Sequence, residues 1–325
     1  MAHAIRFHKT GGPEVLQWEE VKIGDPGPGE LRIVHKAIGL NYIDTYHRTG
    51  LYPMPLPSGI GLEAAGVVDA AGPGVTEFKA GDRVAYCNGP IGAYSEVKIH
   101  PAERCVKLPD GISFEQAACM MLQGLTVQYL LRRLHVVPKA GDTVLFHAAA
   151  GGVGLIACQW ARELGVNMIG TVSSDAKAEL AKAHGCAQTI VYTREDFVAR
   201  TKELTGGKGV PVVYDSIGKD TFPQSLDCLC PRGLFVSYGS SSGPIAAFNL
   251  GILGQKGSLY VTRPTLFTYA AKREALTAMA DDVFALVLAG KIKSEARQRF
   301  PLRDAAAAHR ALESRATTGA TVLLP

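Results

Sequence analysis

A glycine-rich turn between a short apolar run and an amphipathic helix constrains the fold most. The run TVLFH (143–147) is followed by AAAGGVG (148–154), and the next segment repeats apolar residues at helical spacing. Ala149, Gly151 and Gly154 match the spacing A-x-G-x-x-G, a variant of the dinucleotide-binding pattern. Gly151 and Gly152 would let the backbone approach a pyrophosphate, which the positive end of the helix dipole attracts. We expect a dinucleotide site; the competing interpretation is a tight turn without a ligand.

Strands and helices alternate from Lys139 onwards, which is the pattern of a parallel sheet with crossover helices. Six apolar runs predict strands at 143–146, 168–172, 190–192, 212–215, 234–238 and 259–262. Six strands suffice for a complete doubly wound sheet. The fold class is therefore α/β, with a Rossmann dinucleotide-binding domain over residues 126–263.

The remainder of the chain is expected to form a second domain. Short alternating segments fill about the first 110 residues and predict a mainly β structure. Ser113 and Gln116 have the spacing of a capping box, so one helix is expected from there to about His135. The tail is expected to form helices over 269–289 and 304–315 and a strand over 321–324. Because this tail is short, it should complete the first domain, giving residues 1–125 and 264–325.

Composition and charge exclude several classes of protein. Apolar residues make up 47% of the chain and charged residues 20%, which fits a globular protein. The net charge is +4 without a basic cluster, so a nucleic-acid partner is disfavoured. No stretch is long and apolar enough for a membrane span, and residues 1–9 lack a signal-peptide core, so we expect a cytoplasmic protein. The seven cysteines form no CxxC motif and are expected to be buried thiols.

The residues that follow the second strand of the Rossmann unit indicate which cofactor to expect. An NAD-binding site places an acidic residue about 20 positions after the glycine turn, and here Ser173 stands there. A hydroxyl group can donate to a 2′-phosphate, and Lys177 would add a positive charge one helical turn later. Asp175 argues for NAD, although it fits a helix N-terminus as well. We expect NADPH. The alternative interpretation is that Lys177 is an ordinary solvent-exposed lysine of the helix and does not bind a phosphate.

At this point the sequence resembles the zinc-free quinone oxidoreductases of the medium-chain dehydrogenase/reductase superfamily, relatives of the lens ζ-crystallins, and most of all their bacterial members. The matching segments include KAIGLNYIDTYHRTGLYP (36–53), LPSGIGLEAAGVV (56–68), QGLTVQYLL (123–131), FHAAAGGVGLIACQWA (146–161), VVYDSIG (212–218) and GSLYVTRPTL (257–266). The resemblance implies a GroES-like catalytic domain beside the Rossmann domain. It also implies a homodimer joined through the Rossmann domains.

The resemblance further implies which residues contact the cofactor. They are Asn41, Tyr46, Thr126, Gly152, Val153, Lys177, Tyr192, Ser240 and Arg315. Lys177 and Tyr192 are expected at the 2′-phosphate, and Arg263 with its loop is expected on the nicotinamide side.

The alcohol dehydrogenase relatives bind a catalytic zinc ion through a cysteine and the histidine of a G-H-E motif. Here the triplet is Gly61-Leu62-Glu63, and the segment from Asn41 to Asp44 contains no cysteine. Glu63 alone cannot supply the three protein ligands of a catalytic zinc, so we expect no metal. A quinone is already electrophilic and needs alignment and hydrogen-bond donors more than a Lewis acid. The sequence therefore predicts NADPH-dependent reduction of quinones.

Candidate donors to the reduced oxygen are Tyr46, Asn41, Tyr52 and Arg263. A phenol with a pKa of about 10 is protonated at neutral pH and can donate. Alternatively, Tyr46 packs on the nicotinamide and the protons come from solvent. His47 is expected at the surface. Two other functions stay open: reduction of α,β-unsaturated carbonyls, and a cofactor-binding structural or RNA-binding role like that of the ζ-crystallins.

Overall fold

The computed structural model describes all residues, 1–325, and the chain separates into two compact units. Unit 1 comprises residues 1–125 and 269–325, and unit 2 comprises residues 126–268. The second border falls after residue 268 rather than after residue 263. The connection that follows the last strand of unit 2 therefore still packs with that unit.

Unit 2 is built on a six-stranded parallel sheet, and all six predicted strands are confirmed. The strands are β9 (Thr143–Phe146), β10 (Asn167–Val172), β11 (Gln188–Val191), β12 (Val210–Asp215), β13 (Leu229–Ser237) and β14 (Tyr260–Thr262). Their spatial order is β11-β10-β9-β12-β13-β14. The direction of chain progression reverses between β9 and β12, and ligands of such sheets bind beyond the carboxyl ends of the strands at this point.

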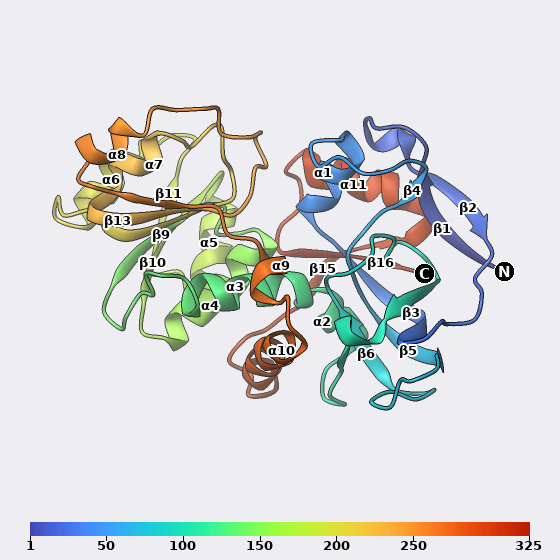
Figure 1. Cartoon of the computed structure of the whole chain (residues 1–325). Helices are drawn as coiled ribbons and strands as arrows, with labels where there is room; N and C mark the ends of the chain where they lie inside the picture. The colour runs from blue at the N-terminus through green and yellow to red at the C-terminus, as the bar shows by residue number, and fades with distance from the viewer. The chain divides into compact units, whose positions relative to one another are not determined.

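Helices cover both faces of this sheet, as Figure 1 shows. Helices α4 (Gly152–Glu163) and α5 (Asp175–Ala183) pack together against β10, while α6 (Phe197–Leu204) and α7 (Gln224–Asp227) pack on the other side. A short helix α8 (Gly251–Gln255) precedes β14. Because both faces are covered, the central strands are mainly apolar, with Leu145, Val213 and Phe235 fully buried.

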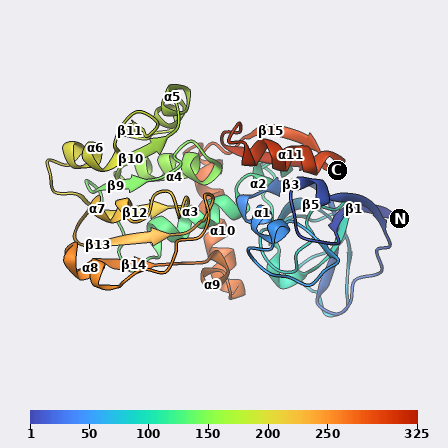
Figure 2. The same ribbon diagram turned by 90° about the horizontal axis from the view of Figure 1, so that it is seen from above.

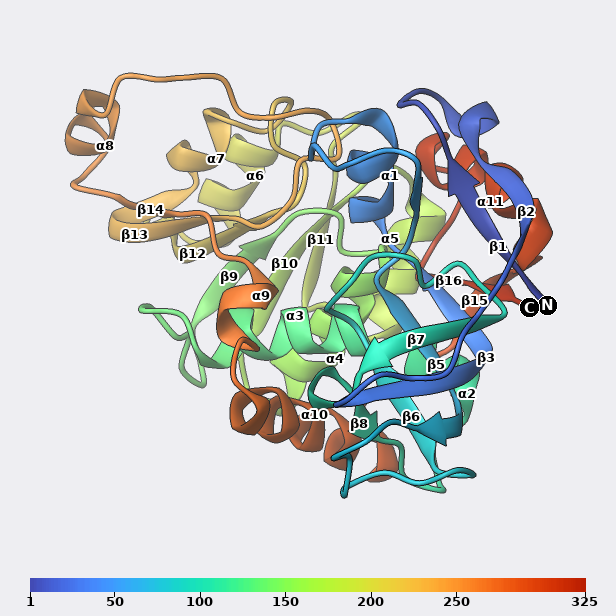
Figure 3. The same cartoon turned by 45° about the vertical axis from the view of Figure 1, so that its right-hand side comes forward.

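Unit 1 is organised around β3 (Glu30–Leu40). Strand β5 (Glu63–Ala71) pairs along one edge of β3, followed by β6 (Arg83–Tyr86) and β8 (Val106–Lys107). Strands β7 (Val97–Pro101) and β16 (Ala320–Leu324) share the other edge. A small sheet of β1 (Ala2–Phe7), β2 (Gln17–Val21) and β4 (Ser58–Gly59) lies next to β7 (Figure 3).

The tail of the chain adds two strands to this sheet rather than the single one expected. Strand β16 pairs antiparallel with β3, and β15 (Ala296–Pro301) pairs parallel with β16. Strand β15 lies at the sheet edge and exposes every second side chain. Its sequence ARQRFP is therefore polar and does not show the apolar pattern that would predict a strand. Helix α11 (Ala305–Glu313) connects the two strands and runs alongside β15 (Figure 2).

The prediction of one helix from Ser113 to about His135 is wrong. The structure has α2 (Phe114–Ala118) and a separate α3 (Met121–Arg132). The capping box itself is confirmed, since Gln116 N donates to Ser113 Oγ over 3.1 Å. The helix stops because Leu122 N donates to Glu63 Oε1 over 2.8 Å, whereas in a continuous helix this amide would donate to the carbonyl group of Ala118.

Two other helices differ from expectation at their ends. The helix expected over 269–289 is confirmed but begins later, as α10 (Arg273–Leu288), and a separate short helix α9 (Leu266–Tyr269) precedes it. Helix α11 ends at Glu313, so Arg315 lies beyond it. Helix α1 (Tyr42–Thr49) was not predicted. None of these helices combines the length and apolar character needed to cross a membrane.

Candidate cofactor and substrate site

The glycine-rich turn joins β9 to α4 at the reversal point of the unit 2 sheet. Gly151 N donates to Ala148 O over 2.9 Å, and Ala149 N donates to Thr171 O of β10 over 3.1 Å. A Cβ atom on Gly154 would lie 2.4 Å from Ala148 O, so only glycine lets the helix approach the backbone of the preceding turn this closely. The expected role of Gly154 in packing therefore has a geometric basis.

The first turn of α4 offers backbone donors at this point. Gly151 is the N-cap residue in an extended conformation, and no side chain caps the helix. The first intrahelical bond runs from Leu155 N to Gly151 O. The amides of Gly152 and Val153 thus stand at the positive end of the helix dipole, where a pyrophosphate fits.

Ser173, Lys177 and Tyr192 are gathered at the carboxyl ends of β10 and β11. Tyr192 N donates to Val172 O over 3.1 Å, which places Tyr192 beside the start of the Ser173 loop. Ser174 Oγ accepts from Lys177 N over 3.4 Å, so Lys177 lies in the first turn of α5. The side chain of Tyr192 is exposed. This corner fits the 2′-phosphate expected from the sequence.

Asp175, which argued for NAD, is neutralised by a partner that sequence reasoning missed. Arg194 donates to both carboxylate oxygens of Asp175, over 2.7 and 2.5 Å. The hydrogen bond from Arg194 holds the pKa of Asp175 below its usual value. Asp175 therefore does not present an uncompensated negative charge to a phosphate, because Arg194, two residues after Tyr192, balances it.

Arg263 lies after β14 and binds the end of β13. Its Nη1 atom donates to Ser237 O over 2.9 Å and to Gly239 O over 3.0 Å, and its Nη2 atom donates to Ser240 Oγ over 3.4 Å. The structure thus brings Arg263 and Ser240 together. The guanidinium group therefore stabilises the loop that carries Ser240 through these hydrogen bonds. Thr126, also in unit 2, lies on α3 and is buried.

Asn41 opens helix α1 of unit 1, and two side chains fix its amide group. Asn41 Nδ2 donates to Glu63 Oε2 over 2.6 Å, and Gln123 Nε2 donates to Asn41 Oδ1 over 3.2 Å. All three residues are buried. Gln123 lies in the QGLT segment, but nothing in the local pattern assigned it a role, because its partner is 82 residues away in the sequence.

The tyrosines of the predicted site form a cluster on and after α1. The ring of Tyr46 lies 5.7 Å from that of Tyr42 and 5.2 Å from that of Tyr52, centroid to centroid. Tyr46 is buried, with 8% of its surface exposed. The prediction that His47 lies at the surface is wrong: its ring packs edge-on against Tyr52 and is buried, and burial lowers its pKa.

Two buried carboxyl groups of unit 1 have raised pKa values. Burial raises the pKa of Glu63 to about 8, although the hydrogen bond from Asn41 opposes the shift. Burial raises the pKa of Asp44 to about 7, against the hydrogen bonds from Asn41 N and the Tyr94 hydroxyl group. Both side chains are fully buried. No group of three or more His, Cys, Asp or Glu side chains is arranged to hold a metal ion.

Comparisons with known proteins identify the family of this chain. Residues 27–110 match the alcohol dehydrogenase GroES-like domain, and residues 152–281 match the family described as zinc-binding dehydrogenase. The chain is 60% identical to a quinone oxidoreductase of Pseudomonas aeruginosa and 50% identical to a 2-haloacrylate reductase of Burkholderia, with 100% of this chain and 100% and 99% of those chains covered. The crystal structure of Escherichia coli quinone oxidoreductase complexed with NADPH superposes with a TM-score of 0.98 at 55% identity, covering 100% of both chains.

These matches define a GroES-like and Rossmann dehydrogenase of the medium-chain superfamily. Within it, the chain belongs to the quinone oxidoreductase family. The family expected from the sequence motifs is thereby confirmed.

The buried carboxyl group of Asp44 predicts a pH-dependent stability difference. In the unfolded chain Asp44 loses its proton near its ordinary pKa of 3.8, whereas in the folded chain it keeps the proton up to about pH 7. Folding is therefore penalised progressively as the pH rises from about 4 to 7, and the penalty is constant above that. Asp44→Asn keeps an acceptor for Tyr94 and Asn41 but cannot ionise.

We expect the free energy of unfolding of Asp44→Asn, minus that of the wild type, to increase by on the order of 2–4 kcal/mol between pH 4 and 8. Urea unfolding at several pH values measures it. Asp110→Asn, at a fully exposed side chain, serves as the control. A difference that stays flat with pH for Asp44→Asn would show that Asp44 is ionised in the folded protein.

Proposed function

We propose that this protein is an NADPH:quinone oxidoreductase that works without a metal ion. The observation that carries the proposal is the glycine-rich turn at the reversal point of the sheet, together with the corner formed by Ser173, Lys177 and Tyr192. It is supported by full-length similarity to quinone oxidoreductases, one of which was crystallised with NADPH.

The residues of unit 2 bind and orient the cofactor. The turn from Ala149 to Gly154 holds the pyrophosphate on the amides of Gly152 and Val153. Lys177 and Tyr192 bind the 2′-phosphate, aided by the hydroxyl group of Ser173. Thr126 and the loop of Ser240, braced by Arg263, position the rest of the dinucleotide. When bound, NADPH supplies a hydride to the acceptor.

Unit 1 carries further proposed contacts to the cofactor. Asn41, Tyr46 and Arg315 contact the cofactor, as in the related family. Asn41 is suited to this role because Glu63 and Gln123 fix both ends of its amide group. The phenol groups of Tyr46 and Tyr52 are the hydrogen-bond donors for the acceptor oxygen as negative charge develops on it.

Glu63 takes a structural role in place of metal binding. Its two carboxyl oxygens accept from Asn41 Nδ2 and Leu122 N, and both bonds lie inside unit 1. A catalytic zinc site needs three protein ligands, and the residues around Glu63 do not supply them. The reaction therefore relies on alignment and hydrogen bonding.

An assay of acceptors tests this function. We expect oxidation of NADPH, followed by its absorbance, with small quinones, and no loss of the rate after treatment with a zinc chelator. Because the site is built for NADPH, NADH should support slower turnover at equal concentration. Absence of NADPH oxidation with every quinone would refute the proposal, and one zinc ion per active chain would refute the metal-free mechanism.

Reduction of activated alkenes is the second candidate. The observation that favours it is the 50% identity to a 2-haloacrylate reductase over the full chain. A conjugated alkene, like a quinone, accepts a hydride at carbon while an oxygen takes up negative charge, so the same donors would serve. The ratio of kcat/KM for quinones to that for α,β-unsaturated carbonyls in the acceptor assay separates the two functions.

The 2′-phosphate corner gives a cofactor-selectivity prediction. Lys177→Ala removes a charge-assisted hydrogen bond to the phosphate, worth about 1.5–3 kcal/mol, so the Kd for NADPH should rise roughly 10- to 100-fold. The Kd for NADH should stay nearly constant, because NADH lacks this phosphate.

Fluorescence titration with both cofactors measures the effect. Lys182→Ala is the matched control, since Lys182 lies on the same helix α5 and pairs with Glu179. Equal weakening of NADPH and NADH binding by Lys177→Ala would remove Lys177 from the phosphate site.

We further propose that two copies associate through their unit 2 sheets. Strand β14 lies at the edge of the sheet, and its Tyr260 and Val261 expose 50% and 39% of their surfaces. An exposed apolar edge strand favours pairing with another strand. Pairing two β14 strands about a two-fold axis would form one continuous sheet.

Sedimentation equilibrium tests the dimer. We expect a mass of about twice the 34.5 kDa of one chain, and Val261→Lys should shift the equilibrium toward monomers because it places a charge at the strand pair. Leu288→Lys, at an exposed leucine of unit 1, is the control. A monomeric wild type would contradict the proposal.

A cytoplasmic location is also proposed. All seven cysteines are free thiols, and six are buried. Free thiols persist in a reducing compartment. Cell fractionation with the quinone assay tests the location.

A further inference from the structure

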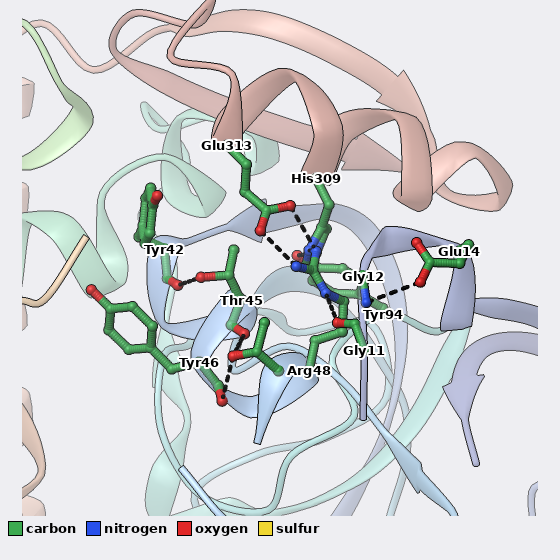
Figure 4. Close-up of polar contacts among 11 residues, drawn as sticks. Gly11, Gly12, Glu14, Tyr42, Thr45, Tyr46, Arg48, Tyr94, His309 and Glu313 are labelled. Atoms are coloured by element: carbon green, nitrogen blue, oxygen red, sulfur yellow. Dashed lines mark hydrogen bonds and ion pairs between the residues drawn. The ribbon is translucent and has the colours of Figure 1, made fainter. Parts of the chain in front are cut away.

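Arg48 is a fully buried cation on helix α1, two residues after Tyr46. Only 1% of its surface is exposed. Its Nη2 and Nη1 atoms donate to the two carboxylate oxygens of Glu313, over 2.6 and 3.0 Å, as Figure 4 shows. This is the bidentate geometry that gives an arginine and a carboxylate a fixed relative orientation. The pair joins α1 to α11, which are more than 250 residues apart in the sequence.

The remaining donors of Arg48 fasten two other segments. Its Nε atom donates to Gly11 O over 3.1 Å, and Nη1 also donates to Nδ1 of His309 over 2.9 Å. An arginine can only donate, so His309 Nδ1 is an acceptor and the proton of the neutral ring sits on Nε2. Burial and the charge of Arg48 keep His309 neutral, lowering its pKa to about 3.

The ring of His309 continues this chain of hydrogen bonds back to α1. Its Nε2 atom lies 3.2 Å from the hydroxyl group of Tyr94, which donates to Asp44 Oδ2 over 2.8 Å. The same oxygen of Asp44 accepts from Asn41 N over 2.9 Å. Helix α1 is thus held at its first turn by Asp44 and at its last turn by Arg48, and α11 is the common anchor.

Arg315 follows Glu313 by two residues and has an unusual backbone conformation. Its φ angle is +61°, a left-handed conformation that favours glycine at the end of a helix. Holding a residue other than glycine there costs roughly 1 kcal/mol, and such strain is concentrated at functional sites. Burial and then the charge of Glu313 raise the pKa of Tyr42 in α1, and the positive charge of Arg315 opposes this shift.

We propose that Arg48 is a positioning residue that sets the spacing between Tyr46 on α1 and Arg315 after α11 through its bidentate pair with Glu313. The inference rests on the proposed function, in which Tyr46 and Arg315 both contact NADPH. One ion pair within unit 1 thereby fixes the relative positions of Tyr46 and Arg315, which come from the two ends of the chain.

Two variants break this pair in different ways. Glu313→Gln removes one charge and one acceptor at a side chain that is 32% exposed, and Arg48→Lys keeps the charge but loses the planar fork. We expect each to raise the Kd for NADPH about tenfold and also to lower kcat at saturating NADPH, because Tyr46 is both a proposed cofactor contact and a proposed donor to the acceptor oxygen. Glu115→Gln, which breaks the exposed pair with Arg299 in the same unit, should leave both values unchanged.

A double-mutant cycle separates positioning from general stability. If Glu313 acts through Arg315, then Glu313→Gln combined with Arg315→Ala should bind NADPH no more weakly than Arg315→Ala alone. Two results would overturn the proposal. One is a double variant whose increase in Kd for NADPH is the product of the two single increases. The other is a Glu313→Gln variant with a lowered melting temperature and an unchanged Kd. If Arg48→Lys does not fold, the Glu313→Gln cycle decides the question.

Measurements on the wild type separate failure of the proposed function from failure of the positioning role. A wild-type protein that neither binds NADPH nor reduces a quinone would refute the proposed function. A wild type that does both, with Glu313→Gln indistinguishable from it, would refute the positioning role alone.

Discussion

The carboxyl group of Glu63 holds together the part of unit 1 on which the site depends. It accepts from Leu122 N, which separates α2 from α3, and from Asn41 Nδ2 at the start of α1. Gly39 on the neighbouring strand leaves the necessary space, since a Cβ atom there would lie 2.2 Å from Glu63 Oε2. Burying a carboxyl group costs free energy, which these two hydrogen bonds offset in part. A residue that stands in a zinc-motif position in the related alcohol dehydrogenases is here an internal helix cap.

The features predicted from the sequence are those encoded locally. The strand, turn and helix around Gly151 follow one another within a few residues, and the six strands of unit 2 follow from short apolar runs, so both were predictable. Strand β15 was not, because its exposed charged residues hide the pattern. The break after Ala118 was not either, since it depends on a contact with Glu63, 59 positions from Leu122.

The same distinction applies to the site. Ser173 and Lys177 could be proposed from spacing after the turn, because the chain runs directly from one strand into the next helix. The partners that set their electrostatic surroundings could not. Arg194 neutralises Asp175 from the next strand connection, and Gln123 reaches Asn41 from α3. Such pairs depend on strand order and helix placement, which a local pattern does not contain.

The pairing of β16 with β3 has a consequence for biosynthesis. Strand β16 (residues 320–324) closes one edge of the unit 1 sheet, yet it is translated after the whole of unit 2. Unit 2 is one continuous segment and can fold as soon as it leaves the ribosome. Unit 1 must wait with the C-terminal half of one edge of β3 open, so its apolar strand residues, such as Ile38, need protection until the tail arrives. Unit 2 can therefore be complete while unit 1 still lacks its last two strands.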